Sequence, residues 1–311
     1  MRSYERLTIF AATLLAAGGL RLLGNARGEL EAAAQRPQPR RDAGATPDGP
    51  RVAAATDGPS DNEGFEPLPP PRPGDWRSAF DEPAQSFEAF VAAGPLQPTP
   101  TRRTIVLQPL GAAASRQRAL LEAVRAYAEA FFQLPARVAP ALRLPAVPRR
   151  SGAEGPQHDA HAIAEALATA RPDDAIAYIG ITFDDLYAPG LHFVFGLGLF
   201  EVGAGVYSLS RFGAPPRANE APSPRLLRRT LKVMSHEIGH VFGLHHCAHF
   251  RCEMNGVNTL EEADRAPAHA CPVCQRKLAH ALGFDRRTRR AALAAFYERH
   301  GLAEEARFLR R

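Results

Sequence analysis

Lysine is nearly absent from this chain of 311 residues, which contains only Lys232 and Lys277. The formal net charge of +5 therefore rests on arginine. The densest arginine clusters, at residues 286–290 and 310–311, have no aromatic side chains within them and no nucleic-acid-binding motif beside them. Because stacking on bases needs aromatic groups, we expect these clusters to form solvated helix faces and expect no nucleic-acid partner.

A hydrophobic run long enough to cross a membrane is also missing. The most apolar stretch, residues 7–20, follows Arg2 and Arg6 and ends at Arg21. A membrane-spanning helix needs about 20 apolar residues, whereas a charged start followed by a shorter apolar run is typical of a signal peptide. We predict that residues 1–26 are a signal peptide or an uncleaved N-terminal anchor, which would be the only membrane contact. This favours export or N-terminal anchoring over a cytoplasmic location.

Aliphatic periodicity is missing from residues 27–75, which are rich in alanine, proline, glycine and arginine. Such a composition predicts a disordered linker, and we find no internal repeat in the chain. The remaining residues 76–311 suffice for one folded domain, which we expect to be monomeric. The apolar patterns predict strands over 104–110, 175–183 and parts of 193–212, helices over 115–134 and 161–170, a polar loop over 148–159, and an amphipathic helix containing 226–233. This order indicates an α/β class with a mixed sheet.

The most informative feature is the sequence from His236 to His246. His236 and His240 are four residues apart, so on a helix both can bind one ion. Glu237 would then face a water molecule at the open fourth position of that ion and act as general base. Gly243 can end the helix with a positive φ, and the turn would deliver His246 as the third ligand. The spacing predicts a catalytic zinc that hydrolyses a polarised carbonyl, most simply a peptide bond.

All the cysteines lie just after this motif, as Cys247, Cys252, Cys271 and Cys274. Two close pairs separated by an intervening segment can enclose a tetrahedral zinc with no open position. Two disulfides are the alternative, which would need an oxidising compartment. We favour a structural zinc because Cys247 directly follows the third histidine. Two zinc ions per chain are therefore expected, one catalytic and one structural.

The composite pattern of histidines, Glu237, Gly243 and cysteines, together with Met254, resembles the archaemetzincins, a branch of the metzincin metalloproteases. Residues 75–76, 85–90, 179–187, 193–196 and 261–265 are also similar to segments of that family. The resemblance implies a metzincin-like zincin fold of the α/β (α+β) class. Its upper part, 76–243, would hold a mixed twisted sheet, a backing helix and the zinc-binding active-site helix. Its lower part, 244–311, would be a small C-terminal helical subdomain with the structural zinc, and Met254 would form an apolar floor beneath the catalytic metal.

The resemblance further implies a zinc metallopeptidase acting on peptides or proteins, with aminopeptidase-like cleavage as one form of that activity. An edge strand within residues 193–212 would pair with the substrate backbone. The alternative is a zinc-stabilised module that binds peptides or a partner with little or no turnover. Glu237 argues against this alternative, because a binding module has no need of a base at that position.

Overall fold

The computed structural model describes residues 64–311, apart from positions 201 and 219. The predicted signal peptide or anchor at 1–26 and most of the predicted linker at 27–75 lie outside these residues. Within the described part of the chain, no helix combines the length and apolarity needed to cross a membrane.

A five-stranded mixed sheet forms the centre of the described body. Its strand order is β2 (Ala136–Val138), β1 (Thr104–Pro109), β5 (Ala175–Thr182), β8 (Ala204–Ser208) and β7 (Gly196–Leu199). The first four strands are parallel, whereas β7 runs antiparallel to β8 and forms one edge of the sheet. Every residue of β5 is buried because helices cover both faces of a parallel sheet. The strands predicted in these regions are confirmed, and β7 supplies the expected edge strand.

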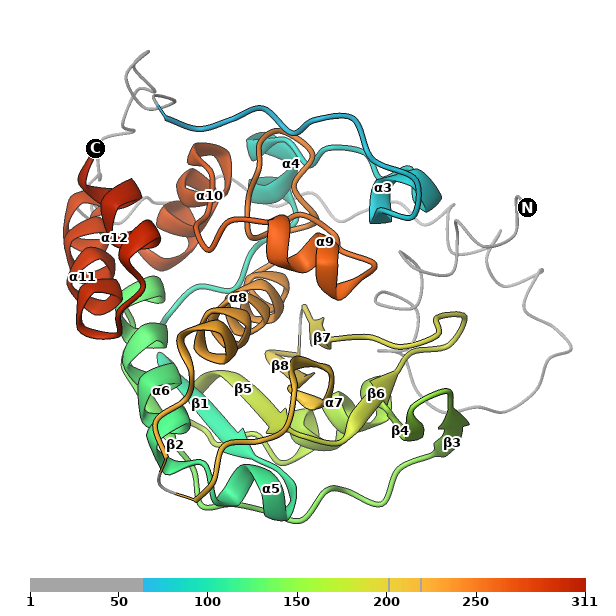
Figure 1. Ribbon diagram of the computed structural model, residues 1–311. Helices are drawn as coiled ribbons and strands as arrows, with labels where there is room; N and C mark the ends of the chain where they lie inside the picture. The colour runs from blue at the N-terminus through green and yellow to red at the C-terminus, as the bar shows by residue number, and fades with distance from the viewer. Residues whose placement is uncertain (1–63, 201, 219) are drawn as a thin grey trace, which may run out of the picture. The chain divides into compact units, whose positions relative to one another are not determined.

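Helices cover the sheet from both sides (Figure 1). Helices α6 (Arg118–Phe132) and α8 (Pro224–Val241) pack on one face and α7 (Ala160–Thr169) on the other. The alternation of side chains along β1 divides them between the two layers: Ile105 and Leu107 join the cluster that contains α6 and α8, and Val106 joins α7. The start of α8 is fixed by Ser223, whose side chain accepts a hydrogen bond from the Leu226 backbone.

The chain after α8, where the sequence predicts a small lower part, is largely helical. It contains α9 (Leu260–Arg265), α10 (Pro272–Leu282), α11 (Arg286–Arg299) and α12 (Ala303–Arg310). The C-terminal helices are anchored on α6, since the Tyr127 and Tyr297 hydroxyls lie 3.0 Å apart in the core.

The expectation of a solvated arginine face at 286–290 is wrong for Arg289, which is only 3% exposed and donates from Nε to the Phe131 carbonyl oxygen. The reason is that α11 begins at Arg286, so its first turn presents Arg289 to α6.

The polar loop expected over 148–159 is instead a hairpin. Strands β3 (Arg149–Gly152) and β4 (Gly155–Asp159) join β6 (Asp185–Tyr187) in a second, three-stranded sheet. Polar contacts hold it together: the Gln157 amide donates to the Asp185 carboxylate at 2.8 Å, and Arg211 pairs with the same carboxylate at 2.7 Å. Such strands carry no apolar alternation, and that alternation was the signal used to predict strands. Two short helical segments, α5 (Gly111–Ser115) and η2 (Ser210–Phe212), complete this part of the chain.

The segment before β1 packs against the lower part. It contains α3 (Trp76–Ala79) and α4 (Phe87–Ala92). Residues 64–75, which the composition placed in the linker, also make defined contacts: the Leu68 backbone donates to the His249 carbonyl at 3.2 Å, and Glu66 pairs with Arg251 at 2.7 Å. The packed body therefore starts before Trp76. Backbone bonds, an ion pair and the contact of the Phe65 ring with Phe308 hold this segment, and a single aromatic residue makes no apolar stripe by which the sequence could reveal it.

Candidate metal centres and active site

Three histidines converge at the C-terminal end of α8. The metal-binding ring atoms of His236, His240 and His246 all lie within 4.8 Å of one another, and the Nε2 atoms of His236 and His240 are 3.0 Å apart. The turn that delivers His246 follows the end of α8 at Val241, and Gly243 adopts a φ of +88°. A side chain at this position would also meet the Phe200 ring, because an added Cβ would lie 2.9 Å from it. The structure thus brings together the three histidines that the spacing predicted.

The surroundings of these imidazoles fit a zinc ion. Each ring holds its Nδ1 against an oxygen acceptor: His236 on the Glu253 carbonyl at 2.8 Å, His240 on the Leu244 carbonyl at 2.7 Å, and His246 on the Glu82 carboxylate at 2.7 Å. Outer-shell acceptors of this kind fix the tautomer and leave Nε2 of each ring for the metal. Burial and the neighbouring His246 lower the pKa of His236 to about 3, which keeps that ring neutral as a ligand must be.

Glu237 lies on the same helix and is buried, 5% exposed, against the edge strand β7. Burial raises the pKa of its carboxyl group to about 8, and a hydrogen bond from the Gly198 backbone opposes that rise. A carboxyl group whose pKa is near neutrality can both accept a proton and return it. Glu237 is therefore a buried carboxyl group on the helix that carries His236 and His240.

The four cysteines form a second cluster. Their Sγ atoms all lie within 4.8 Å of one another, and all four residues are buried. The sulfurs of Cys247 and Cys271 are 3.6 Å apart, against about 2.05 Å for a disulfide bond, and none of the four cysteines is disulfide-bonded. The Cys252 sulfur accepts backbone N–H groups from Met254 at 3.4 Å and Cys271 at 3.2 Å. Four converging sulfurs with backbone donors fit a closed tetrahedral zinc site and do not fit two disulfides.

One loop links the two clusters. Met254, two residues after Cys252, packs beneath α8, because a Cβ added to Gly239 would lie 2.5 Å from its sulfur. Its carbonyl oxygen accepts from the Cys247 backbone at 2.7 Å, and the preceding carbonyl, of Glu253, holds His236. Met254 thus lies between the histidine-bearing helix and the cysteine cluster, and the apolar floor beneath the catalytic metal that the resemblance implies stays a prediction.

Comparison with known proteins identifies the family. Residues 154–280, which include both clusters, match the family model of Peptidase family M54. Archaemetzincin-2 of Pongo abelii is 31% identical over 271 residues, covering 75% of this chain and 75% of that protein. The archaemetzincin of Thermococcus kodakarensis is 39% identical over 104 residues, covering 33% of this chain and 56% of that protein. The solved archaemetzincin structure from Methanopyrus kandleri superposes with a TM-score of 0.50 at 27% identity, covering 60% of this chain and 98% of that one.

The chain belongs to the archaemetzincin family. It is accordingly a zinc metallopeptidase, a hydrolase of peptides or proteins, and the expected mixed α/β zincin fold is confirmed.

Two glycines let the edge strand of this archaemetzincin lie directly on α8. A Cβ on Gly198 would be 2.3 Å from the Glu237 carbonyl oxygen and 3.0 Å from the His240 Cβ. One on Gly196 would be 2.6 Å from the Glu237 Cγ. Sequence reasoning placed an edge strand here but gave these glycines no role, although their alternation in Gly-Leu-Gly-Leu marks a strand with one bare face.

We expect Gly198→Ala to impair both the fold and the site. The added methyl group must push β7 away from α8, which costs about 1–3 kcal/mol of stability and breaks the hydrogen bond to Glu237. Denaturant unfolding and peptide cleavage would measure the two effects. Leu197→Ala is the matched control, since Leu197 packs with the cluster on the other face of the sheet. It should lower stability with little change in cleavage per folded molecule. Full activity and stability in Gly198→Ala would contradict the close packing described here.

Several supporting residues of the site carried no sequence signal. Gln85, 8% exposed, donates from its amide to the Gly243 carbonyl at 2.9 Å, and Lys277 donates to the Gln85 side-chain oxygen at 3.1 Å. Glu82 and Trp76 lie beside His246. These contacts join residues that are far apart in the chain, and no local spacing encodes them. The similarity of residues 75–76 and 85–90 to the family was the one hint that this segment mattered.

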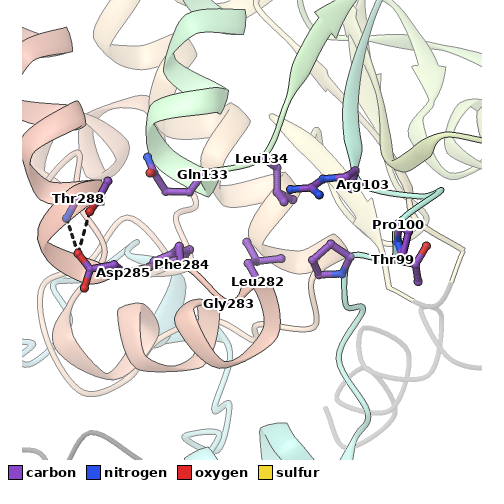
Figure 2. A pocket seen from close by; sticks show the side chains of 11 residues that line it. Thr99, Pro100, Arg103, Gln133, Leu134, Leu282, Gly283, Phe284, Asp285 and Thr288 are labelled. Carbon is purple, nitrogen blue, oxygen red and sulfur yellow. Dashed lines mark hydrogen bonds between the residues drawn. The ribbon is translucent and has the colours of Figure 1, made fainter. Parts of the chain in front are cut away.

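A cavity of about 550 Å³ lies away from both clusters, between the 98–103 loop, the end of α6 and the junction of α10 and α11 (Figure 2). Arg103 and Asp285 are the charged residues that line it. Figure 2 shows Asp285 turned to Thr288, where its carboxylate accepts the backbone N–H at 2.8 Å and caps α11. None of the residues that line this cavity belongs to the histidine cluster or to the cysteine cluster.

Proposed function

We propose that this zinc metallopeptidase hydrolyses peptide bonds at the three-histidine cluster, with Glu237 as the general base. The observation that carries the proposal is the convergence of the His236, His240 and His246 rings with a buried carboxylate one residue after His236. No other group of at least three metal-binding side chains among the described residues includes histidine.

The chain's own residues would divide the work as follows. His236, His240 and His246 would hold Zn²⁺, which when bound acts as a Lewis acid and lowers the pKa of a water molecule to about 7. Glu237 would take a proton from that water and pass it to the leaving amine. The outer edge of β7 would hold the peptide, because an edge strand carries backbone groups that can pair with an extended chain.

The cysteine cluster would hold the second zinc ion. Four thiolates fill all four positions of a tetrahedral ion, so this zinc would stabilise the fold and take no part in hydrolysis. Aminopeptidase-like cleavage is the finer form of the proposal, and it rests on the family resemblance alone. The fragment ends in the experiment below distinguish it from cleavage within the peptide.

The test is selective removal of metal from the full chain. We expect two zinc ions per chain, of which a mild chelator removes only the one at the open histidine site. Cleavage of a diverse peptide library, followed by mass spectrometry, should disappear on chelation and return when zinc is added, while circular dichroism stays unchanged. One zinc per chain with titratable thiols would contradict the structural site. Cleavage that survives loss of the labile zinc would contradict the catalytic site. No cleavage by the protein with both ions bound would favour the binding-module alternative.

We also propose export or N-terminal anchoring, which the charged and apolar residues at the start of the sequence support. Cell fractionation with detection of the mature N-terminus tests it. Recovery of the intact chain only in the cytoplasmic fraction would contradict it.

A further inference from the structure

The chain's single tryptophan, Trp76, and the carboxylate of Glu82 lie against the third histidine of the cluster. Glu82 Oε2 accepts a hydrogen bond from His246 Nδ1 at 2.7 Å and another from Trp76 Nε1 at 3.0 Å. Both side chains come from the N-terminal segment, which precedes the first strand of the sheet. The metal centre therefore includes a part of the chain more than 150 residues away from its histidine motif.

We propose that Glu82 is a positioning residue that fixes the ring orientation and tautomer of His246, and that Trp76 holds Glu82 in place. This inference rests on the proposed function only in taking His246 as a zinc ligand. The Glu82 carboxylate contacts the ring of His246, so it would act on the metal centre through that ligand.

His246 needs such support more than the other two ligands do. His236 and His240 are fixed by α8, and their Nδ1 atoms bond to backbone carbonyls close by. His246 lies on a loop after the helix has ended, and its Nδ1 partner is a side chain from a distant segment. A carboxylate partner also makes the imidazole a stronger ligand than a neutral carbonyl does, because its negative charge raises the basicity of the ring nitrogen that binds the metal.

Trp76 is itself held from several sides, so it can fix Glu82. Its backbone N–H donates to the Glu262 carboxylate at 3.0 Å, and its ring stacks on Phe80 with centroids 4.1 Å apart. Gly256 also lies against the indole, since an added Cβ there would lie 2.4 Å from Trp76 Cδ1. The indole and the His246 ring make a T-shaped contact, with centroids 5.1 Å apart. These contacts hold the indole in the orientation in which its N–H donates to Glu82.

The full chain with Glu82→Gln, Glu82→Asp and Glu66→Gln provides the test. Zinc affinity at the histidine site is measured by competition with a chelator, and the emission of Trp76 reports binding, since no other tryptophan contributes. We expect Glu82→Gln to weaken this zinc about 10–100-fold, the range found when outer-shell partners are removed. Glu82→Asp keeps the charge and should recover part of the loss. Glu66 belongs to the same segment but pairs with Arg251, so Glu66→Gln should bind zinc as the wild type does.

A merely structural role would give a different result. It would lower the unfolding free energy of the zinc-free protein and leave zinc affinity unchanged. For Glu82→Gln we expect weaker zinc binding and an unchanged unfolding free energy. Zinc affinity within twofold of the wild type, or an equal loss in Glu66→Gln, would overturn the proposal. If Glu82→Gln does not fold, Trp76→Phe keeps an aromatic side chain and removes the indole N–H donor. Unchanged zinc affinity in that variant counts against the role of Trp76 in holding Glu82. Zinc affinity can be read without any peptide turnover, so a failure of the proposed function would appear separately.

Discussion

Glu237→Gln is expected to lower kcat/KM for peptide cleavage by about 10²–10⁴-fold while both zinc ions stay bound. Glutamine has nearly the same shape and can still contact the Gly198 backbone, but it cannot accept a proton from water. The three imidazoles keep their own acceptors, so their positions should not change. Steady-state cleavage of a peptide found in the library experiment, together with metal analysis of the same sample, measures both quantities.

The control for this variant is Glu261→Gln, which removes an exposed carboxylate on α9 and should leave cleavage and zinc content unchanged. Two results would contradict the role given to Glu237. Activity within tenfold of the wild type would mean that another group takes the proton. Loss of the labile zinc would mean that Glu237 mainly supports the metal centre.

The catalytic cluster could be predicted from the sequence because its geometry is local. His236 and His240 share a face by the periodicity of a helix, and Gly243 supplies the one backbone conformation that turns His246 back toward them. The cysteine cluster follows the same logic, with each pair close in sequence. The central strands could be predicted for a related reason. A strand buried on both faces, such as β5, is a continuous apolar run that needs no knowledge of its neighbours.

The parts that could not be predicted depend on contacts between distant residues. Glu82 and Gln85 support the site across more than 150 residues, and nothing near them in sequence names their partners. The β3–β4 hairpin is held by polar side chains, so it looked like a loop. Arg289 looked like one more surface arginine, although its guanidinium stacks over Phe131, 4.1 Å from the ring centroid, inside the core. In each case the role of the residue depends on a contact that forms only in the folded protein.

Cys271→Ser should have the largest effect on stability of the substitutions considered. A structural zinc contributes about 10–16 kcal/mol in small zinc domains, which is comparable to the whole stability of a typical protein. Serine cannot supply the fourth thiolate, and Cys271 directly precedes α10 as its N-cap residue, so loss of the metal would release the start of that helix. We expect loss of this zinc, unfolding of the lower part, and rapid proteolysis after residue 244. Circular dichroism, limited proteolysis and zinc content measure these effects.

His240→Ala is the matched comparison, because it removes a ligand from the other site. It should abolish cleavage and release one zinc, yet leave the fold nearly intact, since α8 is held by its packing on the sheet. The cysteine site, by contrast, should affect both the fold and the activity. Cys271→Ser should also abolish cleavage, because the Glu253 carbonyl that holds His236 and the Met254 side chain beneath Gly239 belong to the cysteine loop. A folded, active Cys271→Ser protein with one zinc would show that the two centres are independent. Loss of both the folded lower part and peptide cleavage would show that the histidine site needs the zinc at the cysteine site.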